Sequence, residues 1–165
     1  MQYGVASPNA PSRAQFRRWV RKALVADARL TIRLVGQAEG RALNRSYRGK
    51  DYATNVLTFI FRERAPFEGD LAICAPVVAR EARAQAKSVI AHYAHLTVHG
   101  VLHLQGYDHE NDADAAAMED LESGIVTALG YPDPYAAERQ APRTANRAGT
   151  KRATKRAQAS YGRSR

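Results

Sequence analysis

The order of apolar and polar positions divides the chain into helical and extended stretches. In residues 13–26, Phe16, Trp19, Val20, Ala23 and Leu24 recur at helical spacing, and basic residues occupy the other faces. Similar patterns, capping residues and stop signals predict further helices over residues 38–47, 76–87, 88–105 and 111–129. Alternating or β-branched and aromatic sequences predict strands over residues 30–35, 56–61 and 70–74.

These elements indicate an α+β fold in which a small mixed β-sheet is packed with helices. The last predicted helix carries an apolar stripe of Met118, Leu121, Ile125 and Leu129, and Gly130 ends it. Beyond Pro134 large apolar residues almost disappear, so ordering this segment would gain too little burial to offset its entropy. We therefore predict one domain over residues 1–137 and a basic, disordered tail over residues 138–165.

The net charge of +9 is concentrated at the end of the chain. Residues 1–138 hold 16 Lys and Arg against 16 Asp and Glu, whereas residues 139–165 hold 9 Lys and Arg and no acid. A basic segment of this kind binds nucleic-acid phosphates without sequence preference, with an affinity that falls as salt rises. A merely solubilising extension is the alternative interpretation.

Composition indicates the cellular compartment of the protein. No apolar run is long enough for a membrane span, and the first residues lack the apolar stretch of a signal peptide. Cys74 is the only cysteine, which excludes an intrachain disulfide, and its apolar neighbours favour a buried position in the core. We therefore expect a cytoplasmic protein that does not interact with membranes.

Three histidines form the most informative motif in the sequence. His99 and His103 are four residues apart in a predicted helix, so their imidazoles can point at one ion. Gly106 can adopt the left-handed conformation that ends the helix and allows His109 to return towards them. Three imidazoles with a vacant fourth position are typical of a catalytic zinc site, and we predict one Zn²⁺ held by His99, His103 and His109.

The same histidine spacing occurs in metzincin peptidases, which place a glutamate directly after the first histidine as general base. This chain has Gly100 there, which argues against proteolysis. Nearby residues have several possible roles. His95 continues the four-residue series, and a packing or supporting role is favoured over a ligand role; His92 is interpreted as structural. Asp108 could orient an imidazole or form the turn.

The histidine string at residues 99–109 resembles the signature of the YbeY family of ribosomal RNA maturation factors. Two further blocks, in the right order, extend the resemblance over most of residues 30–130. One runs Leu-Asn-Arg-Ser-Tyr-Arg-Gly-Lys-Asp at residues 43–51 and Thr-Asn-Val-Leu-Thr-Phe at residues 54–59. The other is Gly-Asp-Leu-Ala-Ile-Cys at residues 69–74.

The resemblance implies a zincin-like fold and a zinc-dependent, single-strand-specific endoribonuclease, a hydrolase. Its implied role is 3′ end maturation of small-subunit ribosomal RNA and ribosome quality control, with the RNA and the small subunit as partners. The three histidines carry over as zinc ligands, and Arg48 as a catalytic arginine able to grip phosphate oxygens. Two alternatives remain open, a metzincin-like metallopeptidase and a non-catalytic ribosome-binding factor with structural zinc.

Overall fold

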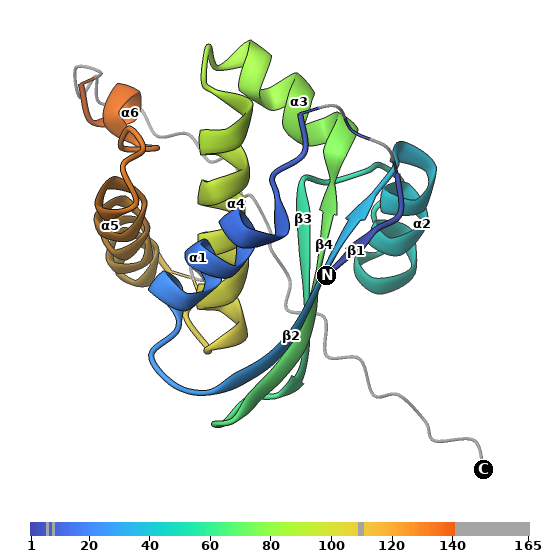
Figure 1. Cartoon of the computed structure of the whole chain (residues 1–165), viewed down its shortest axis with the longest axis horizontal. Helices are drawn as coiled ribbons and strands as arrows, with labels where there is room; N and C mark the ends of the chain where they lie inside the picture. The colour runs from blue at the N-terminus through green and yellow to red at the C-terminus, as the bar shows by residue number, and fades with distance from the viewer. Residues whose placement is uncertain (6, 8, 109–110, 141–165) are drawn as a thin grey trace.

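A computed structural model describes residues 1–5, 7, 9–108 and 111–140 of the chain (Figure 1). It contains ten elements in these residues, six helices and four strands. In chain order they are β1 (Gln2–Tyr3), α1 (Arg13–Ala23), β2 (Ala28–Val35), α2 (Gln37–Arg48), β3 (Val56–Arg62), β4 (Phe67–Cys74), α3 (Ala75–Ala84), α4 (Val89–Leu104), α5 (Asp112–Ala128) and α6 (Ala136–Gln140).

The four strands form one mixed sheet in the order β1-β2-β4-β3. β2 runs parallel to β4 along its whole length, from Ala28 opposite Phe67 to Val35 opposite Cys74. β3 pairs with β4 in the antiparallel sense, as expected for two strands joined by a short connection. The predicted small mixed sheet packed with helices is confirmed.

Helices cover both faces of this sheet (Figure 1). Along β4, Leu71 and Ile73 join the main core with residues of α1, α4 and α5, whereas Ala72 and Cys74 join a second core against α2. This alternation follows from the two-residue period of a strand, and it explains why β4 is apolar at successive positions. The predicted burial of Cys74 is confirmed, since this residue is 1% exposed.

Every helix and strand predicted from the sequence is present, with ends shifted by a few residues. The prediction missed β1, whose two residues are too few for a periodic pattern, and it missed α6. α6 covers residues 136–140, so residues 138–140 of the predicted tail are helical, and Arg139 bonds to Asp133 at 2.7 Å. The rest of the predicted tail, residues 141–165, lies outside the described residues.

α4 occupies the centre of the helical side of the molecule. It begins at Ser88, whose hydroxyl accepts a hydrogen bond from the amide of Ala91, and it packs against α1, α3, α5, β3 and β4. Within the described ranges, none of the helices is both long and apolar enough to cross a bilayer.

Candidate metal centre

Three histidines of α4 lie on the side of the helix that meets α5. His95, His99 and His103 follow one another at intervals of four residues, so their rings form a row along the helix. His92 lies one turn earlier and points elsewhere, with its Nε2 atom 2.8 Å from a carboxylate oxygen of Glu81 in α3. The structural interpretation of His92 agrees with this contact.

The rings of His99 and His103 converge. Their centroids are 4.5 Å apart, and the two Nε2 atoms are separated by 3.1 Å. Two nitrogens bound to one tetrahedral zinc ion at about 2.0–2.1 Å would lie about 3.3 Å apart. The separation of these two nitrogens is therefore close to that of two ligands of one zinc ion.

The third predicted ligand, His109, lies outside the described residues. Accordingly, no group of three or more metal-binding side chains occurs in residues 1–5, 7, 9–108 and 111–140. The turn that should bring His109 back is partly described: α4 ends at Leu104, and Gly106 has a φ of +91°. The prediction that Gly106 takes up a left-handed conformation after the helix is confirmed, and the ligand role of His109 stays a prediction.

A buried carboxylate from α5 fixes the orientation of His99. Glu122 is 1% exposed, and its Oε1 atom lies 2.6 Å from Nδ1 of His99. Its Oε2 atom lies 2.8 Å from Nε2 of His95 and also accepts a hydrogen bond from the hydroxyl of Tyr135. One carboxylate thus holds two histidines of the row and a tyrosine from the segment after α5.

These contacts determine where the proton of His99 lies. Burial opposes ionisation of Glu122, but hydrogen bonds from His95 and His99 outweigh it and hold the pKa of this carboxyl well below its usual range. An ionised carboxylate only accepts hydrogen bonds, so Nδ1 of His99 must carry a hydrogen. In a neutral ring the lone pair is then on Nε2, the atom that faces His103 and the form in which histidine binds a metal.

His95 takes part in the same network without facing the His99 and His103 pair. Burial lowers the pKa of His95, and although Glu122 opposes this effect, the net shift favours a neutral ring. Its Nε2 hydrogen is directed at Glu122, and its Nδ1 atom is buried without a hydrogen-bond partner in the described part of the chain. The structure therefore supports the supporting role for His95 over the ligand role.

Position 100 faces the sheet. A Cβ atom added to Gly100 would lie 2.5 Å from Cδ2 and 2.9 Å from Cγ of Leu71, and 3.3 Å from Oγ1 of Thr58. A glutamate at this position would require the side chain of Leu71, or α4 itself, to move. The metallopeptidase alternative thus lacks its general base for a structural reason as well as a sequence reason.

Arg48 is the last residue of α2, which packs on the opposite face of the sheet from α4. The neighbouring Tyr47 stacks edge-on against Phe59 of β3, with ring centroids 4.7 Å apart. The preceding strand residue, Thr58, donates a hydrogen bond to the carbonyl of Gly100 in α4 at 3.5 Å. Contacts through β3 thus connect the end of α2 with α4, and the catalytic role of Arg48 stays a prediction.

Sequence reasoning assigned the orienting carboxylate to Asp108 as one possibility and missed Glu122. It placed Leu121 in the buried stripe of α5, but Leu121 is 40% exposed, whereas Met118, Glu122 and Val126 are buried at intervals of four residues. The signal that could have identified Glu122 was its place between Met118 and Val126, two apolar residues at four-residue intervals on the same helix. A carboxylate in that position requires polar partners from another element.

Comparison with known proteins agrees with the three blocks of the sequence. The family profile described as "Endoribonuclease YbeY" matches residues 7–130. A protein named Endoribonuclease YbeY from Nitrosomonas eutropha is 56% identical over 135 residues, covering 82% of this chain and 96% of that protein. Its namesake from Aromatoleum aromaticum is 60% identical over 127 residues, covering 77% of this chain and 82% of that protein.

A solved structure shares the fold. The solution structure of TM1509 from Thermotoga maritima has a TM-score of 0.59 and 25% sequence identity, covering 90% of this chain and 97% of that one. The family profile spans β2, β3 and β4, α4 with its histidine row, and α5 with Glu122. The chain therefore belongs to the YbeY family of endoribonucleases, hydrolases that act on RNA.

Proposed function

We propose that this protein is a zinc-dependent, single-strand-specific endoribonuclease that acts in ribosomal RNA processing, at the 3′ end of small-subunit RNA, and in ribosome quality control. The observation that carries the proposal is that the Nε2 atoms of His99 and His103 lie 3.1 Å apart, while Glu122 is hydrogen-bonded to the other ring nitrogen of His99. The relatives named Endoribonuclease YbeY support the reaction class. Their name also disfavours the alternative of a non-catalytic ribosome-binding factor.

The proposed metal ligands are His99, His103 and His109. Imidazole nitrogens suit zinc, and a three-histidine set leaves a fourth position for water or substrate. When bound, zinc would supply Lewis acidity, lowering the pKa of a bound water and polarising a phosphate oxygen. The buried Glu122 keeps the His99 ring in one tautomer and one orientation, which is the usual role of a carboxylate behind a metal-binding histidine.

Arg48 is proposed to bind the scissile phosphate. A guanidinium is always charged and can donate two parallel hydrogen bonds to phosphate oxygens, so it can neutralise charge that develops during cleavage. Arg48 lies at the end of α2, and α2 and α4 contact the edge strand β3 from opposite sides. This position supports an approach of Arg48 to the phosphate from the side of β3 that is opposite α4.

The proposed partners are ribosomal RNA and the small ribosomal subunit, in the cytoplasm. The charge distribution supports an RNA partner, because residues 139–165 carry 9 basic residues and no acid. Such a segment would add affinity for phosphates without sequence preference.

Metal analysis combined with RNA digestion tests the proposal. Purified protein should contain one zinc ion per chain, cut single-stranded RNA, and lose this activity in a chelator and regain it with zinc. His103→Ala should lose both zinc and cleavage. His92→Gln is the matched control, because His92 lies in the same helix but bonds to Glu81, and it should keep both. Cleavage at the wild-type rate by a metal-free His103→Ala protein would refute the proposal.

A further inference from the structure

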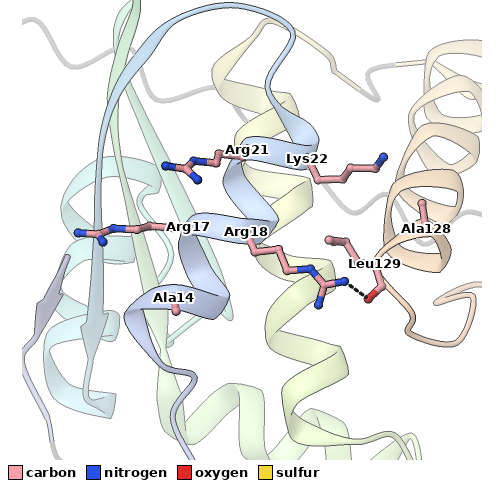
Figure 2. A pocket seen from close by; sticks show the side chains of 7 residues that line it. All are labelled: Ala14, Arg17, Arg18, Arg21, Lys22, Ala128 and Leu129. Atoms are coloured by element: carbon pink, nitrogen blue, oxygen red, sulfur yellow. Dashed lines mark hydrogen bonds between the residues drawn. The ribbon is translucent and has the colours of Figure 1, made fainter.

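A basic groove lies between α1 and the C-terminal end of α5, separate from the histidine row (Figure 2). Four of the residues that line it are cationic. Its lining consists of Ala14, Arg17, Arg18, Arg21, Lys22, Ala128 and Leu129. Figure 2 shows the four cationic side chains extending from one helix, α1, on both sides of its axis.

The charges of α1 form two rows. The helix contains five basic residues and no acid; Arg13, Arg17 and Arg21 follow one another at four-residue intervals, and Arg18 and Lys22 form a second row beside them. A rise of about 1.5 Å per residue places a positive charge about every 6 Å along each row. All five are exposed, and none takes part in the ion pairs found among the described residues.

The opposite face of α1 is firmly anchored. Phe16 and Trp19 are fully buried and stack edge-on at 5.2 Å, and Phe16 also stacks against Tyr93 of α4. At the groove, Nη2 of Arg18 donates a 3.2 Å hydrogen bond to the carbonyl of Leu129, shown as the dashed line in Figure 2. The cationic rows therefore project from a fixed helix, so little conformational entropy of the backbone would be lost on binding.

The packing of α1 also decides which kind of polyanion fits. A membrane-surface helix must insert its apolar face into lipid, but here that face is buried against α4. Arginine side chains in a regular row suit the repeated phosphates of a nucleic acid, which they can bind bidentately. Tyr93, which faces α1, and His99 are six residues apart in α4, or about 120° around the helix. None of the residues that line the groove comes from α4, so the groove is a surface separate from the histidine pair.

We infer that Arg17, Arg21 and Lys22, with Arg18 beside them, form a second RNA-binding surface that grips the sugar-phosphate backbone away from the point of cleavage. The choice of RNA as the polyanion rests on the proposed function. The surface reads no base sequence, and it adds affinity and orientation for long or structured RNA. A short single strand that only fills the cleavage site does not reach it.

The test is a triple variant, Arg17→Gln, Arg21→Gln and Lys22→Gln, which keeps Arg18 and its bond to Leu129. Its control is Arg29→Gln, Arg80→Gln and Arg83→Gln, which removes three exposed charges from other elements. Binding of a long RNA is measured against salt in chelator, so that cleavage does not interfere. Because each phosphate contact to a single strand contributes about 0.7 to the slope of log affinity against log salt, the groove variant should lose about 2 from that slope.

The expected result is an affinity loss on the order of tenfold at moderate salt for the groove variant, well beyond that of the control. Cleavage of a very short oligonucleotide and zinc content should match the wild type. Equal slopes for the two variants would overturn the inference. So would a groove variant that loses binding to polyglutamate but not to RNA, because that result assigns the surface to an acidic protein. A wild-type protein that binds RNA through the groove without cutting it would refute only the proposed function.

Discussion

Oε1 of Glu122 and Nδ1 of His99 are joined by a 2.6 Å hydrogen bond between α5 and α4. Because the carboxylate can only accept, this bond directs the Nε2 lone pair of His99 towards His103. The geometry of the candidate metal site therefore depends on the docking of a second helix, as well as on the spacing of histidines within one.

We predict that Glu122→Gln weakens zinc binding about 10- to 100-fold, the usual effect of losing a carboxylate behind a metal-binding histidine. The amide keeps the shape of the side chain but has one acceptor atom where the carboxylate has two. It therefore cannot accept the hydrogen bonds of both His99 and His95. Competition with a chromophoric chelator measures the affinity. Glu119→Gln, in the same helix, is the control, and equal affinity in the two variants would contradict the role given to Glu122.

Gly100→Ala should destabilise the fold by about 1–3 kcal/mol, the usual cost of overpacking a core. The added methyl would meet the buried side chain of Leu71 at 2.5 Å, so that side chain or α4 must shift. Gly124→Ala is a matched control, because its methyl meets nothing within 4 Å and alanine favours a helix interior by about 0.5–1 kcal/mol over glycine. Urea unfolding followed by circular dichroism compares the two, and a neutral Gly100→Ala would show that the packing of Leu71 against α4 can adjust without cost.

The thiol of Cys74 should resist alkylation in the folded protein. Burial raises the pKa of the Cys74 thiol, so the folded chain keeps this proton at alkaline pH values where the unfolded chain has begun to lose it. The folded state then binds more protons than the unfolded state, and stability should fall as pH rises through the ordinary thiol range. Thiol titration with a chromogenic disulfide at pH 7 to 9, with and without urea, tests this. Rapid reaction without urea would contradict the burial of Cys74.

Removing residues 141–165 should weaken binding to long RNA and flatten its salt dependence, because 8 of the 9 basic residues beyond residue 138 are lost. The cut spares Arg139, whose guanidinium bonds to Asp133 and Asp120. Zinc content and thermal stability should therefore stay at wild-type values. Fluorescence anisotropy with labelled RNA at several salt concentrations measures the slope, and an unchanged slope would assign RNA binding to the folded domain alone.

The elements and the histidine pair could be predicted because their signals are local. Four-residue spacing places His99 and His103 on one face of any helix, and Gly106 marks its end whatever surrounds it. Glu122 could not be assigned a role in this way, because an acid in an apolar stripe is explained only by the histidines that another helix presents. For the same reason, the exposure of Leu121 depends on how α5 docks against α4.

The central position of α4 also has a consequence for hydrogen exchange. The helix that carries His99 and His103 is enclosed by α1, α3, α5 and two strands, so its peptide groups cannot meet solvent unless several neighbours detach together. Deuterium uptake by its amides should accordingly be among the slowest in the protein and should report global unfolding. The imidazoles of His99 and His103 therefore stand on the part of the fold that opens last.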